Sequence, residues 1–361
     1  MYFTEQNFPW SFNFISQMLK RIILALCIAG FFKIGFAQHP DWDKVDVTYL
    51  QLPLMPVSPM AKNYSMQVYS NQNTNSNTGY IPINRSVNTV ASQLTIAGCT
   101  PVTTTLPDFT VLVMFSGFQI TSATPQSNYT VINGAAKYQY FYQISYLNAV
   151  TVQVVDGNGT MVRQFTVNNT DKILSRTSPY FNSSVDANNW FYNNYLNAYF
   201  FQSCDNEAYQ RAVTNTQNQL NNELGYLVKT IHVEVAGMKN KPEYNDLNQA
   251  FTTVSSGYDL LSSNKDKAFD NILQATLIWE KALLESNMTD KKARINDHIT
   301  EALYENLAVG YCFLEQWDLS QQNLQKLAQL NIGGSLENKI KKAQELKSDY
   351  MMRVTASKLK E

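Results

Sequence analysis

The feature that most constrains the fold of this chain is a change in charge density near residue 238. Residues 38–238 contain 20 Asp, Glu, Lys or Arg side chains in 201 positions, whereas residues 239–361 contain 33 in 123 positions. The first part is rich in Asn, Thr, Ser, Tyr and Val, a composition typical of strands and polar loops. The second part is dominated by Lys, Glu, Leu, Ala and Gln, which favour helices with a solvent-exposed face. We therefore expect an α+β chain, with a β-rich domain over 38–236 followed by an all-α domain over 243–358.

Alternating apolar residues predict the strands of the first part. The clearest case is residues 150–167, where two β-branched runs flank Asp156–Gly159 and predict a hairpin. Further strands are expected at 45–52, 64–70, 108–120, 137–146 and 227–235. The segments 186–203 and 205–224 are expected to be helices, so the β-rich domain carries a helical insert. The polar stretch 71–106 predicts a loop in its first half and a strand in its second half.

The N-terminal region has the layout of a secretory signal peptide. Lys20 and Arg21 precede an apolar run over residues 22–32, and Gly35-Phe36-Ala37 places small residues before a cleavage site. We expect translation to start at Met18 and cleavage to follow Ala37, so that residues 1–37 are absent from the mature protein. The new N-terminal Gln38 resembles exported proteins of Bacteroidota. These features predict a protein of the periplasm or cell surface, with no transmembrane segment after cleavage.

The mature chain has no charge excess that would favour nucleic acid. From Gln38 onward it has 25 Lys or Arg against 28 Asp or Glu, a net charge of −3. It also has three cysteines, Cys99, Cys204 and Cys312, so at most one disulfide can form. Pairing of Cys99 with Cys204 stays open from the sequence, and buried thiols are the preferred interpretation.

No catalytic or metal-binding motif is found in the sequence. The chain lacks Gly-x-Ser-x-Gly, His-Glu-x-x-His, a P-loop and a calcium loop. Its three histidines, His39, His232 and His298, are widely separated along the sequence. We therefore expect neither an enzyme nor a bound cofactor or metal.

A pattern of small and bulky residues in the second part predicts packed helix pairs. Its positions are Tyr304, Leu307, Ala308, Tyr311, Ser320, Leu324 and Leu327, at spacings of 3, 1, 3, 9, 4 and 3. The small side chains of Ala308 and Ser320 would let two antiparallel helices cross closely. Part of the pattern also occurs upstream, at Ala275, Trp279 and Ala282 and at Phe251, Val254, Ser255 and Tyr258.

This pattern resembles the tetratricopeptide repeat (TPR) over residues 243–330, with one good repeat and one degenerate repeat. The upstream linker is about eight residues longer than the family's period of 34 allows. The resemblance implies a curved helical array whose concave side binds a peptide or partner protein, with the helix at 335–358 as its C-terminal cap. Partner contacts are then expected at polar residues such as Asn248, Glu305 and Asn306, together with the exposed face of the capping helix. The lysines at 339, 341, 342 and 347 lie mostly off the apolar stripe of that helix and are interpreted as a solvated face. We expect Asn248 and Asn306 to be exposed, so that changing either to Ala alters stability by less than about 0.5 kcal/mol.

The function that follows is an exported, non-enzymatic protein that binds or assembles other proteins of the cell envelope. The alternative is a periplasmic or cell-surface carbohydrate-binding protein, because residues 190–201 place seven aromatic side chains among asparagines. Phe191, Tyr195 and Tyr199 in that segment recur at i, i+4 and i+8, which favours a buried helix face. A hydrolase whose site is assembled from distant residues is a third, weaker hypothesis.

Overall fold

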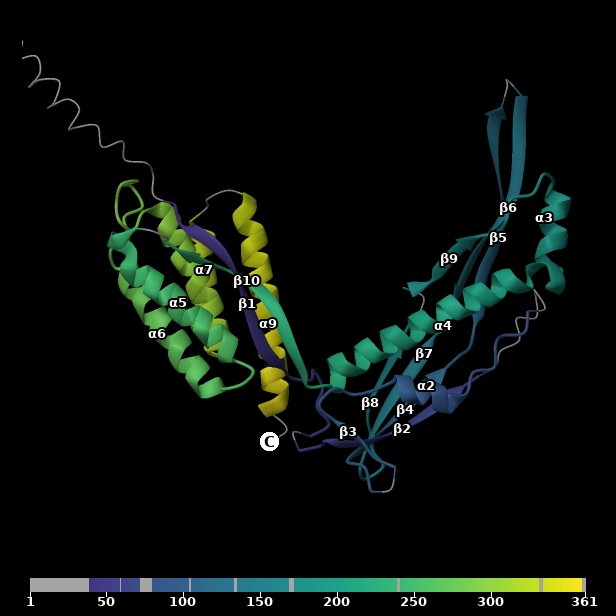
Figure 1. Cartoon of the computed structure of the whole chain (residues 1–361), viewed down its shortest axis with the longest axis horizontal. Helices are drawn as coiled ribbons and strands as arrows, with labels where there is room; N and C mark the ends of the chain where they lie inside the picture. Colours follow the sequence, from purple (N-terminus) through teal and green to yellow (C-terminus); the bar gives the residue numbers. More distant parts are fainter. Residues whose placement is uncertain are drawn as a thin grey trace, which may run out of the picture.

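The computed structural model describes residues 39–58, 60–71, 80–103, 105–132, 135–168, 172–238, 241–330 and 334–358. The predicted signal peptide and its cleavage site lie outside the described residues, as do residues 72–79 of the predicted loop. The described chain combines helices with three separate sheets, in agreement with the α+β class (Figure 1).

A five-stranded sheet forms one part of the molecule, with strand order β3-β2-β4-β7-β8. Its strands are β3 (Thr100–Pro101), β2 (Asn63–Ser70), β4 (Phe109–Phe115), β7 (Val150–Asp156) and β8 (Met161–Val167). Strands β2 and β4 are parallel, and β4, β7 and β8 are antiparallel. The predicted hairpin is confirmed: Asp156 Oδ1 accepts hydrogen bonds from the backbone N–H groups of Asn158 and Thr160, and Gly159 has a φ of 86°.

A three-stranded antiparallel sheet follows, in the order β5-β6-β9. It comprises β5 (Gln119–Ile132), β6 (Ala135–Leu147) and β9 (Leu174–Thr177). The sequence interpretation treated 108–120 as one strand, and this was wrong. The chain leaves the first sheet after Phe115, and Gly117 with a φ of 81° precedes the start of β5. Only the base of the β5–β6 hairpin pairs with β9, so its outer part projects as an arm (Figure 1).

Three helices accompany these sheets: α2 (Val87–Gln93), α3 (Ser184–Phe191) and α4 (Asn194–Leu224). In the second half of 71–106 the structure has the end of α2, irregular backbone over residues 94–99 and only the two-residue strand β3, instead of the predicted strand. The predicted boundary between two helices near residue 204 was also wrong. The helices separate at Tyr192 and Asn193 instead, because the Asn193 side chain accepts hydrogen bonds from the backbone N–H groups of Tyr195 and Leu196 and starts α4 there.

Helix α4 joins the two sheets into one body. Its N-terminal half packs Phe201, Cys204 and Ala208 into the core of the three-stranded sheet. Its C-terminal half packs Leu220 and Leu224, with neighbouring residues, against the five-stranded sheet.

A two-stranded antiparallel ribbon, formed by β1 (Asp41–Gln51) and β10 (Leu227–Gly237), packs on the C-terminal helices. These are the 3-10 turn η2 (Pro242–Tyr244), α5 (Asn245–Leu260), α6 (Lys265–Leu283), α7 (Asp297–Phe313), α8 (Trp317–Gln329) and α9 (Gly334–Lys358). Val47, Tyr49, Val233 and Val235 enter the same hydrophobic core as the helices. Both strands precede the change in charge density, so the compositional boundary does not coincide with the boundary of this core.

Helices α5 to α8 pack in sequence, each against the next, and α9 contacts α7 and α8. Ser320 of α8 is buried and its hydroxyl donates to the backbone oxygen of Ala308 on α7 at 2.7 Å. The packing residues predicted from the repeat pattern are buried, apart from the half-buried Tyr304: Leu307, Ala308, Tyr311, Ser320, Leu324, Ala275, Trp279 and Ala282.

Arg353 of α9 joins this helical part to the rest of the chain. Its side chain is 4% exposed, and its guanidinium donates to both carboxylate oxygens of Asp349. The same group donates to the backbone oxygen of Leu52, after β1, and to both the backbone and side-chain oxygens of Asn222, near the end of α4. A cation at the C-terminal end of α4 also complements the helix dipole.

Candidate functional site

The most distinctive candidate site lies along the outer edge of β10. Asn306 of α7 hydrogen-bonds both the N–H and the C=O of Ala236, at 3.0 Å each, so the backbone of Ala236 faces away from β1. Because the pleat repeats every two residues, the backbone groups of Glu234 and His232 face the same edge. The ribbon has only two strands among the described residues, so no strand pairs with this edge.

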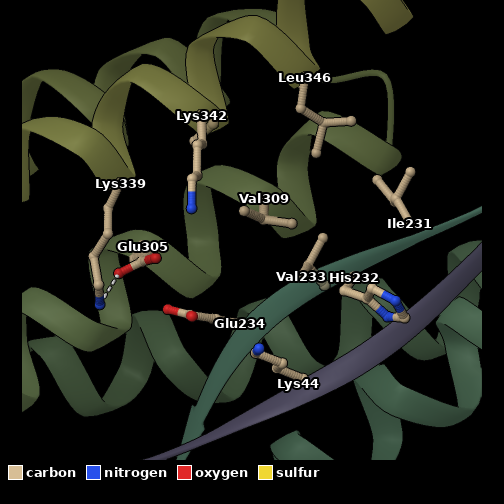
Figure 2. A pocket seen from close by; sticks show the side chains of 11 residues that line it. Lys44, Ile231, His232, Val233, Glu234, Glu305, Val309, Lys339, Lys342 and Leu346 are labelled. Atoms are coloured by element: carbon tan, nitrogen blue, oxygen red, sulfur yellow. Dashed lines mark hydrogen bonds and ion pairs between the residues drawn. The ribbon is translucent and has the colours of Figure 1, made fainter. Parts of the chain in front are cut away.

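A cavity of about 420 Å³ lies beside this edge, beneath α9 (Figure 2). We call it the β10 groove. It is lined by Lys44, Ile231, His232, Val233, Glu234, Glu305, Val309, Lys339, Lys342, Ala343 and Leu346. Four consecutive residues of β10 take part, as expected when a strand presents its edge. The α9 residues stand at i, i+3, i+4 and i+7, which places them on one face of that helix.

One end of the β10 groove holds an internal ion pair. Lys339 Nζ lies 3.0 Å from Glu305 Oε2 and 3.4 Å from the centre of the Trp42 ring. Glu305 is 7% exposed, and burial raises the pKa of its carboxyl while the Lys339 ammonium opposes that rise. These contacts hold both side chains in place.

The other charges of the groove are not neutralised in this way. Within the described part of the chain, Lys44, Glu234 and Lys342 form no ion pair, and Figure 2 shows Lys342 pointing from α9 toward β10. The groove therefore has three lysines against two glutamates. His232 pairs with Asp46 across the ribbon at 2.5 Å, but both side chains are more than half exposed, so this pair contributes little.

The apolar side chains of the groove are Ile231, Val233, Val309, Ala343 and Leu346. An extended peptide could hydrogen-bond to the β10 edge, place alternate side chains on this apolar surface and bring an acidic side chain to Lys342. This is the geometry of strand addition to a free sheet edge.

The three residues expected to contact a partner lie elsewhere than the sequence suggested. Asn306 is 2% exposed and Glu305 is 7% exposed. Asn248 is half-buried and hydrogen-bonds the N–H and C=O of Met238 at 2.8 and 2.7 Å. The expected exposure of Asn306 and Asn248 was wrong, because both amides satisfy backbone groups of the chain itself. Only Glu305 lines the β10 groove.

Sequence reasoning missed most of the groove. The lysines at 339 and 342 were interpreted as part of a solvated helix face, and Lys44 and Glu234 were not singled out. Their i, i+3 spacing on the last helix was the available signal, but the strand opposite them cannot be identified from local pattern.

The aromatic segment 190–201 is divided between core and surface. Trp190, Phe191 and Phe201 are buried, whereas Tyr195 is 93% exposed and Tyr199 is 86% exposed. The prediction that Phe191, Tyr195 and Tyr199 share one buried face was therefore wrong, because the helix break at Asn193 changes the phase of the stripe.

The remaining chemistry is limited among the described residues. The three thiols Cys99, Cys204 and Cys312 are free, and burial raises the pKa of each, to about 12 for Cys312. Within the described ranges, no three His, Cys, Asp or Glu side chains come together as a metal site would require. Among the helices that the structure describes, none is both long and apolar enough to cross a membrane.

Comparison of the chain with protein-family models and with curated proteins gives no match.

Proposed function

We propose that this protein is an exported, non-enzymatic binding protein of the cell envelope, and that its β10 groove holds an extended segment of a partner protein. The observation that supports this most is the free edge of β10, which faces a cavity under α9 instead of another strand. The volume of about 420 Å³ lies within the range of roughly 300–1,000 Å³ that is common for ligand sites.

The edge defines how much of a partner can pair. Within the groove, His232 and Glu234 each offer one N–H and one C=O, so a segment held there can form up to four backbone hydrogen bonds with β10. Asn306 occupies the next such position, at Ala236, and ends the available edge. The paired part of the partner is therefore about four or five residues long, at roughly 3.3 Å per residue.

The lining defines which side chains suit the groove. Alternate side chains of an added strand point to the same side, where Val309 and Leu346 offer apolar contact. Lys342 and Lys44 favour an acidic residue on the partner, since neither has an ion-pair partner among the described residues. We therefore expect an extended segment with alternating apolar residues and at least one Asp or Glu.

Two sequence features agree with this role. The signal-peptide layout of residues 18–37 supports export to the envelope, where partner proteins of the same compartment would be available. The resemblance of residues 243–330 to TPR proteins implies protein binding, and the groove lies on helices α7 and α9 of that region and its cap.

The experiment selects short random peptides on the mature chain and measures the affinity of the enriched peptides. Lys342→Glu should weaken their binding about tenfold or more. Lys341→Glu is a matched control, because Lys341 is exposed on the same helix, does not line the groove and changes the net charge equally. N-methylation of alternate peptide nitrogens should abolish binding in one register only, as strand addition requires.

Peptides that bind both lysine variants equally, or that tolerate N-methylation at every position, would refute the proposal. Amide-exchange protection on peptide binding should increase at His232 and Glu234 and stay unchanged in β4 as an internal reference.

A further inference from the structure

A second surface, at the junction of α3 and α4, has a separate chemical character. Its exposed side chains are Tyr192 at 66%, Tyr195 at 93%, Leu196 at 59% and Tyr199 at 86%. We call these four residues the tyrosine patch. Tyrosine normally buries much of its ring, so three neighbouring rings this exposed indicate a binding surface.

The local fold explains why these rings are outside the core. The buried side of the first turns of α4 is formed by Asn197, Phe201 and Cys204, and Asn197 Nδ2 donates to the backbone oxygen of Phe191 at 2.8 Å. That anchoring leaves positions 195 and 199, which are four residues apart, together on the opposite side of the helix.

An open cavity of about 500 Å³ adjoins the patch. It is lined only by asparagine and tyrosine: Asn188, Asn189, Tyr192, Asn193, Asn194 and Tyr195. Asn188 Oδ1 accepts from the Tyr142 hydroxyl at 2.6 Å, and Asn193 Oδ1 accepts from the start of α4. The side chains of Asn189 and Asn194 form no hydrogen bond within the described chain, so both amides can donate to and accept from a ligand.

The chain segment that forms this cavity contains no charged side chain. No Asp, Glu, Lys, Arg or His occurs between Asp186 and Asp205. None of the residues that line the cavity is charged, so a phosphate, a carboxylate or a nucleic acid would meet no cation in the lining, and a basic segment would meet no anion. A neutral ligand with many hydroxyl groups and flat C–H faces fits best, because the rings can stack on it and the amides can bond its hydroxyls.

We propose that the tyrosine patch and its asparagine-lined cavity bind a neutral polysaccharide, with a pyranose ring stacked on Tyr195 and hydroxyl groups bonded to Asn189 and Asn194. This site is independent of the β10 groove. Figure 1 shows α3 and the start of α4 at the end of the molecule away from α9. The protein could thus hold a glycan at one end and a protein segment at the other.

The test is affinity electrophoresis of the full mature chain in gels containing one soluble neutral polysaccharide at a time, built from glucose, mannose or xylose. Polygalacturonate is the anionic control. At least one neutral polysaccharide should retard the protein, and polygalacturonate should not. Tyr195→Ala should weaken retardation about tenfold or more, whereas Tyr195→Phe should retain most of it because the ring remains.

Matched controls separate this site from other surfaces. Tyr129→Ala removes another exposed tyrosine, on the β5–β6 arm, and should leave retardation unchanged. Lys342→Glu in the β10 groove should also leave it unchanged, so that this proposal and the peptide proposal can fail separately. Circular dichroism checks that each variant is folded.

Three outcomes would overturn the proposal. The first is absence of retardation in every neutral polysaccharide. The second is retardation that Tyr195→Ala and Tyr199→Ala leave intact. The third is a concentration-dependent dimer in sedimentation that Tyr195→Ala dissociates, which would assign the patch to a protein interface.

Discussion

The substitution Asn306→Ala tests the structural basis of the β10 groove most directly. Asn306 is 2% exposed and Ala236 is 5% exposed, so neither the amide nor the backbone groups that it binds have ready access to water. The amide replaces a missing strand at this point, by accepting from the Ala236 N–H and donating to the Ala236 C=O. Removing it leaves two buried backbone groups without a partner.

The magnitude follows from those two groups. Each buried donor or acceptor left unsatisfied costs about 1–3 kcal/mol, and a water molecule entering the vacated space would recover part of this. Asn306→Ala should therefore lower the free energy of unfolding by about 2–5 kcal/mol. Asn306→Asp should cost a similar amount, because it keeps the acceptor but places a carboxylate oxygen against the Ala236 carbonyl.

The assay is urea unfolding followed by circular dichroism, with amide exchange across residues 231–238. Asn338→Ala is the control, because Asn338 is an exposed asparagine on α9 and should stay within about 0.5 kcal/mol of the wild type. Asn248→Ala should fall between them, at about 1 kcal/mol, since its bonds to Met238 are only partly buried. An Asn306→Ala variant as stable as the Asn338 control would refute the assignment of Asn306 as a substitute for a strand.

Three further substitutions test other parts of the structure. Arg353→Met should lower stability by about 2–4 kcal/mol in urea unfolding, because the carbonyls of Leu52 and Asn222 lose their buried donor. Gly257→Ala should lower the Tm although alanine favours helix by about 1 kcal/mol, since its Cβ would lie 2.9 Å from Ile272 Cγ1 and overpacking costs about 1–3 kcal/mol. Burial raises the pKa of the Glu305 carboxyl above 4.5 in the folded protein, so the folded state binds this proton more tightly than the unfolded state does. The folded protein therefore loses stability as the pH rises and this carboxyl ionises. The Tm of Glu305→Gln, measured against the wild type, should show no gain below pH 4.5 and a growing gain toward pH 7.

Local patterns in the sequence were sufficient for individual elements. The hairpin at 150–167 and the strands β1, β2, β6 and β10 were predicted, because alternation of apolar residues is a property of neighbouring positions. The pairing of β1 with β10 was not predicted, since these strands are separated by the whole β-rich part of the chain. The change in charge density made this pairing harder to predict, because both strands have the composition of residues 38–238 but pack on the helices that follow.

The candidate sites were harder to predict for the same reason. The helical period at Asn306 indicates a polar position but cannot show that the end of β10, 70 residues earlier, needs its amide. For Tyr195 and Tyr199 the missing information was one residue, Asn193, whose capping bonds shift the start of α4 and turn those rings outward.

An exposed strand edge invites pairing with other chains, and proteins commonly cover such an edge or place lysines on it. In this chain Asn306 closes the β10 edge at Ala236, while α9 lies over the next positions without filling the space between. Two copies pairing edge to edge through β10 would bring the Lys342 side chains of both copies together, and like charges at such close range destabilise the pair. An acidic partner segment is favoured instead, because its carboxylate neutralises Lys342 while its backbone forms hydrogen bonds with the free edge of β10. The same lysine thus disfavours self-association and favours one class of partner, which is why Lys342→Glu should weaken peptide binding and should not by itself promote dimers.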